Sequence, residues 1–102
     1  MAPSPAVGCL LMRDFVGEQY LPASDLGAVE RCVRAAREAT KELTLEGTRV
    51  RYLRSIFVPE DETCMHMYRA DSVEAVQAAA ARASLRLDRI AEVIIDMGIS
   101  DD

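Results

Sequence analysis

The sequence predicts an α+β domain of the ferredoxin-like type, with its elements in the order β-α-β-β-α-β. Two segments carry the three- and four-residue spacing of an amphipathic helix, and four short apolar segments flank them in that order. The 102 residues are enough for one domain, and 50% of them are hydrophobic, which suits a single core. We therefore expect a four-stranded antiparallel sheet with both helices on one face.

The first predicted strand and the first helix occupy the opening part of the domain. Residues 9–15 are short and apolar, which is typical of a buried strand, and residues 17–23 are expected to form a loop. Ser24 is a favourable N-cap for a helix whose apolar positions recur over residues 26–43. The opposite side of this helix is expected to face solvent and carries Arg31, Arg34, Arg37, Glu38, Lys41 and Glu42.

Two further strands follow as a hairpin. Residues 49–58 and 63–69 are rich in β-branched and aromatic side chains, which favours strands. The polar turn over residues 59–62 is so short that the two strands must be antiparallel.

A second helix and a fourth strand complete the predicted order. Asp71 or Ser72 begins the helix, and with Asp71 as the cap, Glu74 takes the capping-box position. Residues 84–89 are expected to connect this helix to an apolar strand over residues 90–95. The predicted boundaries are a proline-rich leader over 1–8, the ferredoxin-like domain over 9–97 and an acidic tail over 98–102.

Composition excludes several classes of protein. The net charge is −5 and the basic residues never form a run, which argues against a nucleic-acid partner. No apolar stretch is long enough to span a bilayer, so no membrane partner is expected. Three cysteines at unrelated spacings (Cys9, Cys32 and Cys64) argue against a disulfide framework and for a cytoplasmic location.

The second strand suggests how the open face of the sheet is covered. One series of alternating side chains is Tyr52, Arg54, Ile56 and Val58, and the other is Arg51, Leu53, Ser55 and Phe57. Neither series is purely polar, so neither face is expected to be fully solvated. We therefore expect a homodimer that stacks sheet on sheet as a dimeric α/β barrel, with an apolar pocket for a small hydrophobic molecule in each subunit.

Four short stretches resemble a family of small bacterial ferredoxin-like proteins of unknown function, some of which are described as nickel-binding. They are LMRDF at 11–15, YLRS at 52–55, ADSVEAV at 70–76 and DRI at 88–90. The resemblance implies a dimerising ferredoxin-like domain and a non-enzymatic, nickel-type metal-binding function as an alternative. The family's glutamate and two histidines are replaced here by Met12, Arg54 and Ala79. No residue is therefore assigned as a metal ligand.

The sequence Cys64-Met65-His66-Met67-Tyr68 contains the densest group of chemically active side chains. Alternation places Cys64, His66 and Tyr68 on one face of the strand. If residue 58 pairs with residue 63, then Ser55 lies opposite His66, Leu53 opposite Tyr68 and Phe57 opposite Cys64. A slip of one residue would instead bring His66 opposite Arg54 or Ile56.

His66 is the only histidine, and an ordinary imidazole exchanges protons near neutral pH. Tyr68 could hydrogen-bond a carbonyl or enolate, and Arg54 or Arg69 could balance a developing negative charge. Together with His66 these groups predict proton transfer next to a carbonyl, as in a cyclase or isomerase that needs no cofactor. The expected catalytic residues are His66, Tyr68 and Arg54. The expected substrate-binding residues are Tyr52, Ser55, Phe57, Cys64, Met12 and Asp14.

Two alternatives for this group of residues stay open. A lone buried histidine is often only a hydrogen-bonded core residue, and the chain would then be a binding or structural module without chemistry. Cys64 and His66 are also possible ligands of copper(I) or zinc, although alternation sends Met65 and Met67 to the opposite face. Whether the chain is an enzyme at all is left open by the sequence.

Overall fold

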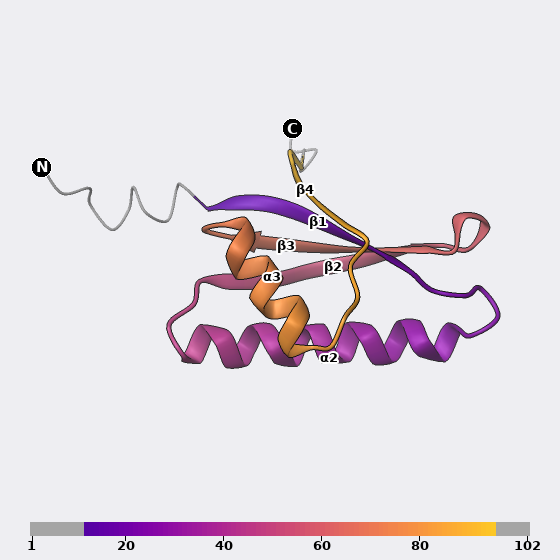
Figure 1. Cartoon of the computed structure of the whole chain (residues 1–102), viewed down its shortest axis with the longest axis horizontal. Coiled ribbons are helices and arrows are strands. Elements are labelled where there is room, and N and C mark those ends of the chain that lie inside the picture. Colours follow the sequence, from indigo (N-terminus) through magenta and orange to yellow (C-terminus); the bar gives the residue numbers. More distant parts are fainter. Residues whose placement is uncertain (1–11, 96–102) are drawn as a thin grey trace, which may run out of the picture.

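The computed structural model describes residues 12–95, and its element order confirms the predicted ferredoxin-like α+β fold (Figure 1). The elements are β1 (Arg13–Tyr20), α2 (Leu26–Leu45), β2 (Val50–Val58), a short 3-10 helix (Pro59–Asp61), β3 (Thr63–Ala70), α3 (Val73–Arg82) and β4 (Arg89–Val93). The strands form one antiparallel sheet in the order β2-β3-β1-β4, so β2 and β4 are its edges.

Both helices cover one face of the sheet, which we call the inner face. A single core joins Ala36 and Leu43 of α2, Val76 of α3, Phe15 of β1 and Tyr68 of β3. The longest helix, α2, runs alongside the edge strand β2 (Figure 1). The opposite, outer face carries the side chains that alternate with these, and no helix or strand of residues 12–95 covers it.

The first strand differs from its predicted position. Residues 9–11 lie outside the described residues, but β1 continues to Tyr20 through the segment that was expected to be a loop. The reason is that β1 is a central strand, paired with β3 on one side and β4 on the other, so its backbone groups are satisfied there. Gly17 hides the alternation in the sequence, and the side chain of Leu87 fills the space beside it.

One helix cap differs from the prediction by one residue, and the other is one of the two residues that the sequence offered. Asp25, not Ser24, caps α2, because its carboxylate accepts a hydrogen bond from the backbone N–H of Ala28. Of the two caps predicted for α3, Ser72 is the one observed, and its hydroxyl accepts from the N–H of Ala75 at 3.2 Å. Glu74 is therefore in the first turn of α3 and not in a capping box with Asp71.

The last strand is shorter than predicted, ending at Val93 instead of residue 95. The leader predicted over 1–8 and the tail predicted over 98–102 both lie outside the described residues.

The register between β2 and β3 positions the residues of interest. Val58 lies opposite Thr63, Phe57 opposite Cys64 and Ser55 opposite His66, as the short turn predicts. A bulge between Tyr52 and Arg54 then shifts the register, so that Tyr52 and not Leu53 lies opposite Tyr68. A bulge sets two residues of one strand against one of the other. It brings the Tyr52 phenol onto the inner face beside His66.

Candidate functional site

His66 lies at the centre of a chain of buried hydrogen bonds on the inner face. Its Nδ1 is 2.6 Å from the hydroxyl of Tyr52, and its Nε2 is 2.8 Å from Oε1 of Gln19. The amide nitrogen of Gln19 donates in turn to the sulfur of Cys32 at 3.7 Å. We call Tyr52, His66 and Gln19 the imidazole cluster, and its imidazole has no exposed surface.

Burial fixes the protonation state of this cluster. It lowers the pKa of His66 to about 4, because a charged imidazolium would lose its hydration. Burial likewise raises the pKa of Tyr52 to about 12, and a hydrogen bond with Ser55 offsets only part of that effect. Both groups are thus neutral at pH 7. The consistent arrangement has the Tyr52 hydroxyl donating to Nδ1, and Nε2–H donating to the carbonyl oxygen of Gln19.

Two other predicted site residues are closed off from solvent. Tyr68 has no exposed surface, packs edge-to-face on Tyr52 at 5.2 Å, and burial raises its pKa. Its hydroxyl has no hydrogen-bond partner among the described residues. Cys64 is also fully buried, and desolvation raises the pKa of its thiol to about 11. Neither side chain is placed to meet a molecule arriving from solvent.

The structure does not bring the predicted catalytic trio together. Arg54 is exposed and pairs with Met67, so it lies on the outer face, away from His66 and Tyr68. His66 faces the helices and not the outer face, on which the sheet of a second copy would stack. It belongs to the core that the helices close, since its alternate neighbours Cys64 and Tyr68 are buried there.

The predicted binding residues are also divided between the two faces. Tyr52, Ser55, Phe57 and Cys64 belong to the inner face with His66. Asp14 belongs to the outer face, where its carboxylate accepts a hydrogen bond from Arg69 at 2.8 Å. Met12 precedes β1 and is half-buried. Only the inner-face group forms a contiguous set.

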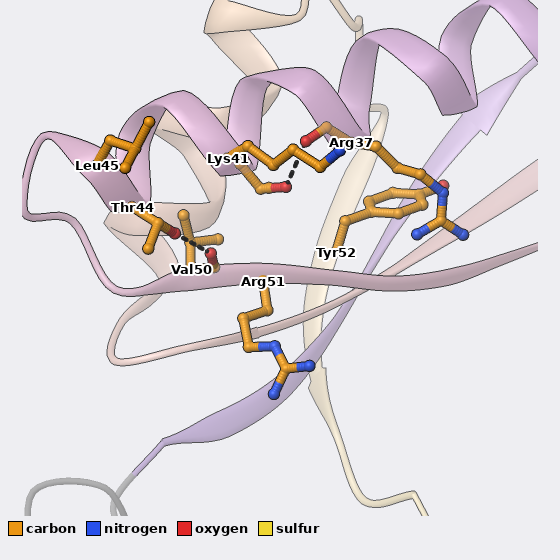
Figure 2. Close-up of a pocket in the computed structure, with 8 residues that line it drawn as sticks. Arg37, Lys41, Thr44, Leu45, Val50, Arg51 and Tyr52 are labelled. Atoms are coloured by element: carbon orange, nitrogen blue, oxygen red, sulfur yellow. Dashed lines mark hydrogen bonds between the residues drawn. The ribbon is translucent and has the colours of Figure 1, made fainter.

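A groove opens between α2 and the edge strand β2, with a volume of about 460 Å³ (Figure 2). We call it the α2/β2 groove. Arg37 and Lys41 lie on its helix side, whereas the guanidinium of Arg51 points away from α2 (Figure 2). The groove contains no carboxylate among its lining residues, which are Arg37, Thr40, Lys41, Thr44, Leu45, Val50, Arg51 and Tyr52.

Tyr52 connects the groove to the imidazole cluster. The guanidinium of Arg37 lies over its ring at 5.0 Å from the centroid, while its hydroxyl contacts His66. Arg37 also lines a second depression of about 580 Å³, which extends along α2 towards Val29 and Glu30 and reaches Ser55 of β2. A molecule in the groove would therefore contact the phenol ring of Tyr52 but not the imidazole behind it.

Sequence reasoning missed three residues of these two sites. Gln19 was assigned to a loop, and Arg37 and Lys41 were assigned to the solvent face of the helix. One signal was available, because Arg34, Arg37 and Lys41 follow at steps of three and four and so form a basic stripe on one side of α2. The stripe alone does not say that β2 lies beside it.

The described residues do not form a metal centre. Within residues 12–95 no group of three or more His, Cys, Asp or Glu side chains could hold a metal ion. Both ring nitrogens of His66 are engaged in hydrogen bonds, and burial keeps the Cys64 thiol protonated. A nickel, copper or zinc ion at this histidine would have to displace the hydrogen bonds of the core, so these residues do not fit one.

Comparison with known proteins identifies the family. A family model described as "Nickel responsive protein SCO4226-like" matches residues 12–93. The chain belongs to the SCO4226-like family. A solved structure, the crystal structure of SCO4226 from Streptomyces coelicolor A3(2), is similar to this chain with a TM-score of 0.67 and 20% sequence identity. The match covers 81% of this chain and 98% of the other. No curated protein matches.

Family membership confirms the resemblance and the fold. At 20% identity the solved structure of SCO4226 shows a common fold alone. The positions that the resemblance singled out are not neighbours on one surface: Ala79 lies on the buried side of α3, whereas Arg54 is exposed on the outer face. Neither helix of residues 12–95 is both long and apolar enough to cross a membrane.

Proposed function

We propose that this chain is a small-molecule-binding protein and that its binding site is the α2/β2 groove. The observation that carries this proposal is the groove itself, whose volume of about 460 Å³ falls in the range of small-molecule sites. Val50 and Tyr52 supply an apolar floor. At one end Leu45, which is 89% exposed, offers an apolar surface that has no partner among residues 12–95.

The imidazole cluster supports this site without taking part in chemistry. A cofactor-free cyclase or isomerase would need His66 to exchange a proton with a ligand through Tyr52, since Tyr52 is the member of the cluster that lines the groove. The pKa of about 12 for the phenol and of about 4 for the imidazole make both ions costly at pH 7. Binding without proton transfer is therefore the function we propose.

A second copy of the chain is the partner we propose for the outer face. The half-buried Met65 and Met67 alternate there with the inner-face residues, and no helix or strand of residues 12–95 covers the outer face. Stacking two such faces would give the α/β barrel expected from the sequence. Sedimentation of the purified protein tests this arrangement, and a monomer at micromolar concentration would contradict it. The cytoplasmic location stays a prediction from the cysteines, of which Cys32 and Cys64 are free.

The groove is tested by a neutral apolar dye and a side chain that fills the cavity. Nile red fluorescence should increase on titration with the wild-type protein. Thr44→Phe places a ring in the groove and should weaken the dye at least about tenfold, because the ring takes the space of the ligand. Gln77→Phe is the matched control, since Gln77 is an exposed position on α3 that lines neither depression.

Two results would contradict the proposal. One is that the wild-type protein binds the dye without saturation or not at all. The other is that Thr44→Phe and Gln77→Phe bind the dye equally well. Circular dichroism of both variants confirms that the fold persists.

A nickel response is the second candidate, and it rests on the family match. The described residues offer no ligand set for the ion, so we expect nickel affinity to be independent of His66. Calorimetric titration with nickel should give the same affinity for the wild-type protein and for His66→Gln. A large loss of nickel affinity in a folded His66→Gln variant would instead show that the imidazole is a nickel ligand. It would favour the nickel response over the proposed small-molecule function.

A further inference from the structure

The two cations on the helix side of the α2/β2 groove have no acidic partner within residues 12–95. Arg37 and Lys41 are four residues apart, so their side chains lie one above the other on α2. Neither forms an ion pair with any described residue, although seven other ion pairs are present in that part of the chain. Arg37 and Lys41 therefore place two positive charges on one side of the groove, in a chain whose net charge is −5.

The nearby carboxylates do not neutralise this pair. Glu42 of α2 and Glu46, which caps the C-terminus of α2, both accept hydrogen bonds from Arg82, which holds them against α3. Glu38 lines neither depression. Glu30 lines the second depression together with Arg34, but it does not line the groove itself. The groove therefore has a positive helix side and an apolar floor.

Arg37 is already held in place before any ligand arrives. Its guanidinium lies over the Tyr52 ring, and Tyr52 is in turn fixed by its hydrogen bond to His66. A cation that is ordered in advance loses little side-chain entropy when it binds an anion. In this way the imidazole cluster contributes to the groove by positioning the residue on which Arg37 rests.

We propose that the ligand of the α2/β2 groove is an amphipathic organic acid. Its anionic group binds between Arg37 and Lys41, and its apolar body lies on Val50, Tyr52 and Leu45 (Figure 2). This inference rests on the proposed small-molecule function and adds the chemical class of the ligand. It also explains why the groove is lined by both cations and aliphatic side chains.

Two dyes of different charge test the inference. Anilinonaphthalene sulfonate is an amphipathic anion, and Nile red is a neutral apolar molecule. In the wild-type protein, raising NaCl from about 50 to about 500 mM should lower the affinity for the anionic dye several-fold more than the affinity for the neutral dye, because salt screens exposed charges. Thr44→Phe should reduce binding of both dyes, which assigns them to the same groove.

The ratio of the two affinities reports the contribution of the lysine. Lys41→Gln should lower the preference for the anionic dye about fivefold, which is the upper range for one exposed ion pair. Lys41→Arg should retain the preference because it keeps the charge. Arg86→Gln is the matched control: it removes one positive charge from an exposed residue that lines neither depression, and it should leave the ratio as in the wild type.

The outcomes separate this inference from the proposed function. One outcome is that Thr44→Phe weakens the binding of both dyes while the ratio of their affinities is insensitive to salt and to Lys41→Gln. That result would refute an anionic ligand and would leave the small-molecule site standing. If neither dye depends on Thr44, both proposals fail.

Discussion

The imidazole cluster and the α2/β2 groove meet at Tyr52, yet they have opposite physical character. The cluster contains the side chains with the most reactive chemistry, but it is closed, neutral and internally hydrogen-bonded. The groove contains ordinary lysine, arginine and aliphatic side chains, but it is open to solvent and positively charged. Access to solvent, more than the reactivity of a residue type, is therefore the ground on which we place the proposed binding site in the groove.

The closed character of the cluster follows from how its polar groups are satisfied. A buried polar side chain without a partner costs stability, whereas a complete network behaves as part of the core. In the cluster each ring nitrogen of His66 has one partner, so no donor or acceptor is left for a ligand. The hydroxyl of Tyr68, which has no hydrogen-bond partner in the described part of the chain, is equally buried.

The largest effect is expected for His66→Ala, which tests whether the imidazole is a core residue. The substitution opens a cavity and removes the partners of Tyr52 and Gln19. We expect the free energy of unfolding to fall by about 4 kcal/mol, measured by urea denaturation. A fall below about 1 kcal/mol, similar to that of the surface variant Arg86→Ala, would show that the histidine is not part of the core.

A smaller effect is expected from acid, with a sign fixed by the buried imidazole. Burial lowers the pKa of His66 in the folded chain to about 4, whereas the unfolded chain binds this proton below about 6.5. The unfolded state therefore holds more protons between these values. The free energy of unfolding should fall by about 3 kcal/mol as pH drops from about 6.5 to about 4. Above that range His66 should add no pH dependence to the free energy of unfolding.

His66→Gln isolates this contribution from that of the carboxylates. The difference in pH dependence between the wild-type protein and the variant should appear between the two pKa values and nowhere else. Because the chain has one histidine, its proton NMR titration gives a single signal that reports the folded-state pKa directly. A midpoint near 6.5 would mean that the imidazole is solvated.

How far the sequence predicts these two regions depends on the range of the interactions involved. The alternation of residues 63–69 and the short turn before them predicted the pairing of His66 with Ser55, because both are local features. The bulge at Tyr52 was not predictable, since both faces of β2 mix apolar and charged residues. This bulge moves the phenol onto the inner face.

The groove was harder to predict than the cluster. Charges on an amphipathic helix normally face water, and Arg37 and Lys41 fit that pattern until β2 is known to lie beside them. The extent of β1 was hidden in a similar way. Gly17 interrupts its hydrophobic alternation, and Gln19 reads as a loop residue until its partner His66 is placed.

Gly17→Ala tests how closely side chains pack beside the imidazole cluster, and we expect an intermediate effect on the free energy of unfolding. Gly17 lies opposite His66, and an added Cβ would come within 2.6 Å of Cδ1 of Leu87. We expect a loss of about 2 kcal/mol because Leu87 must move, and the same substitution should cost less on a Leu87→Ala background. Gly27→Ala is the control: its Cβ would meet only the ends of two exposed side chains, so it should be neutral or stabilising.

Tyr52→Phe gives the smallest expected effect on stability and probes the residue that both regions share. It removes the hydroxyl that donates to Nδ1 of His66 but keeps the ring on which Arg37 rests. We expect a loss of about 1 kcal/mol in urea denaturation, since one buried acceptor is left unpaired. Tyr20→Phe serves as the control, because the Tyr20 side chain is exposed and its hydroxyl only makes a long contact with Glu62.

The same substitution on a His66→Leu background completes the argument. On this background no unpaired ring nitrogen remains, so Tyr52→Phe should cost less and lose only the hydrogen bond with Ser55. An equal cost on both backgrounds would show that the phenol is held by something other than the imidazole. The two regions would then be independent, and the positioning of Arg37 through Tyr52 and His66 would have to be abandoned.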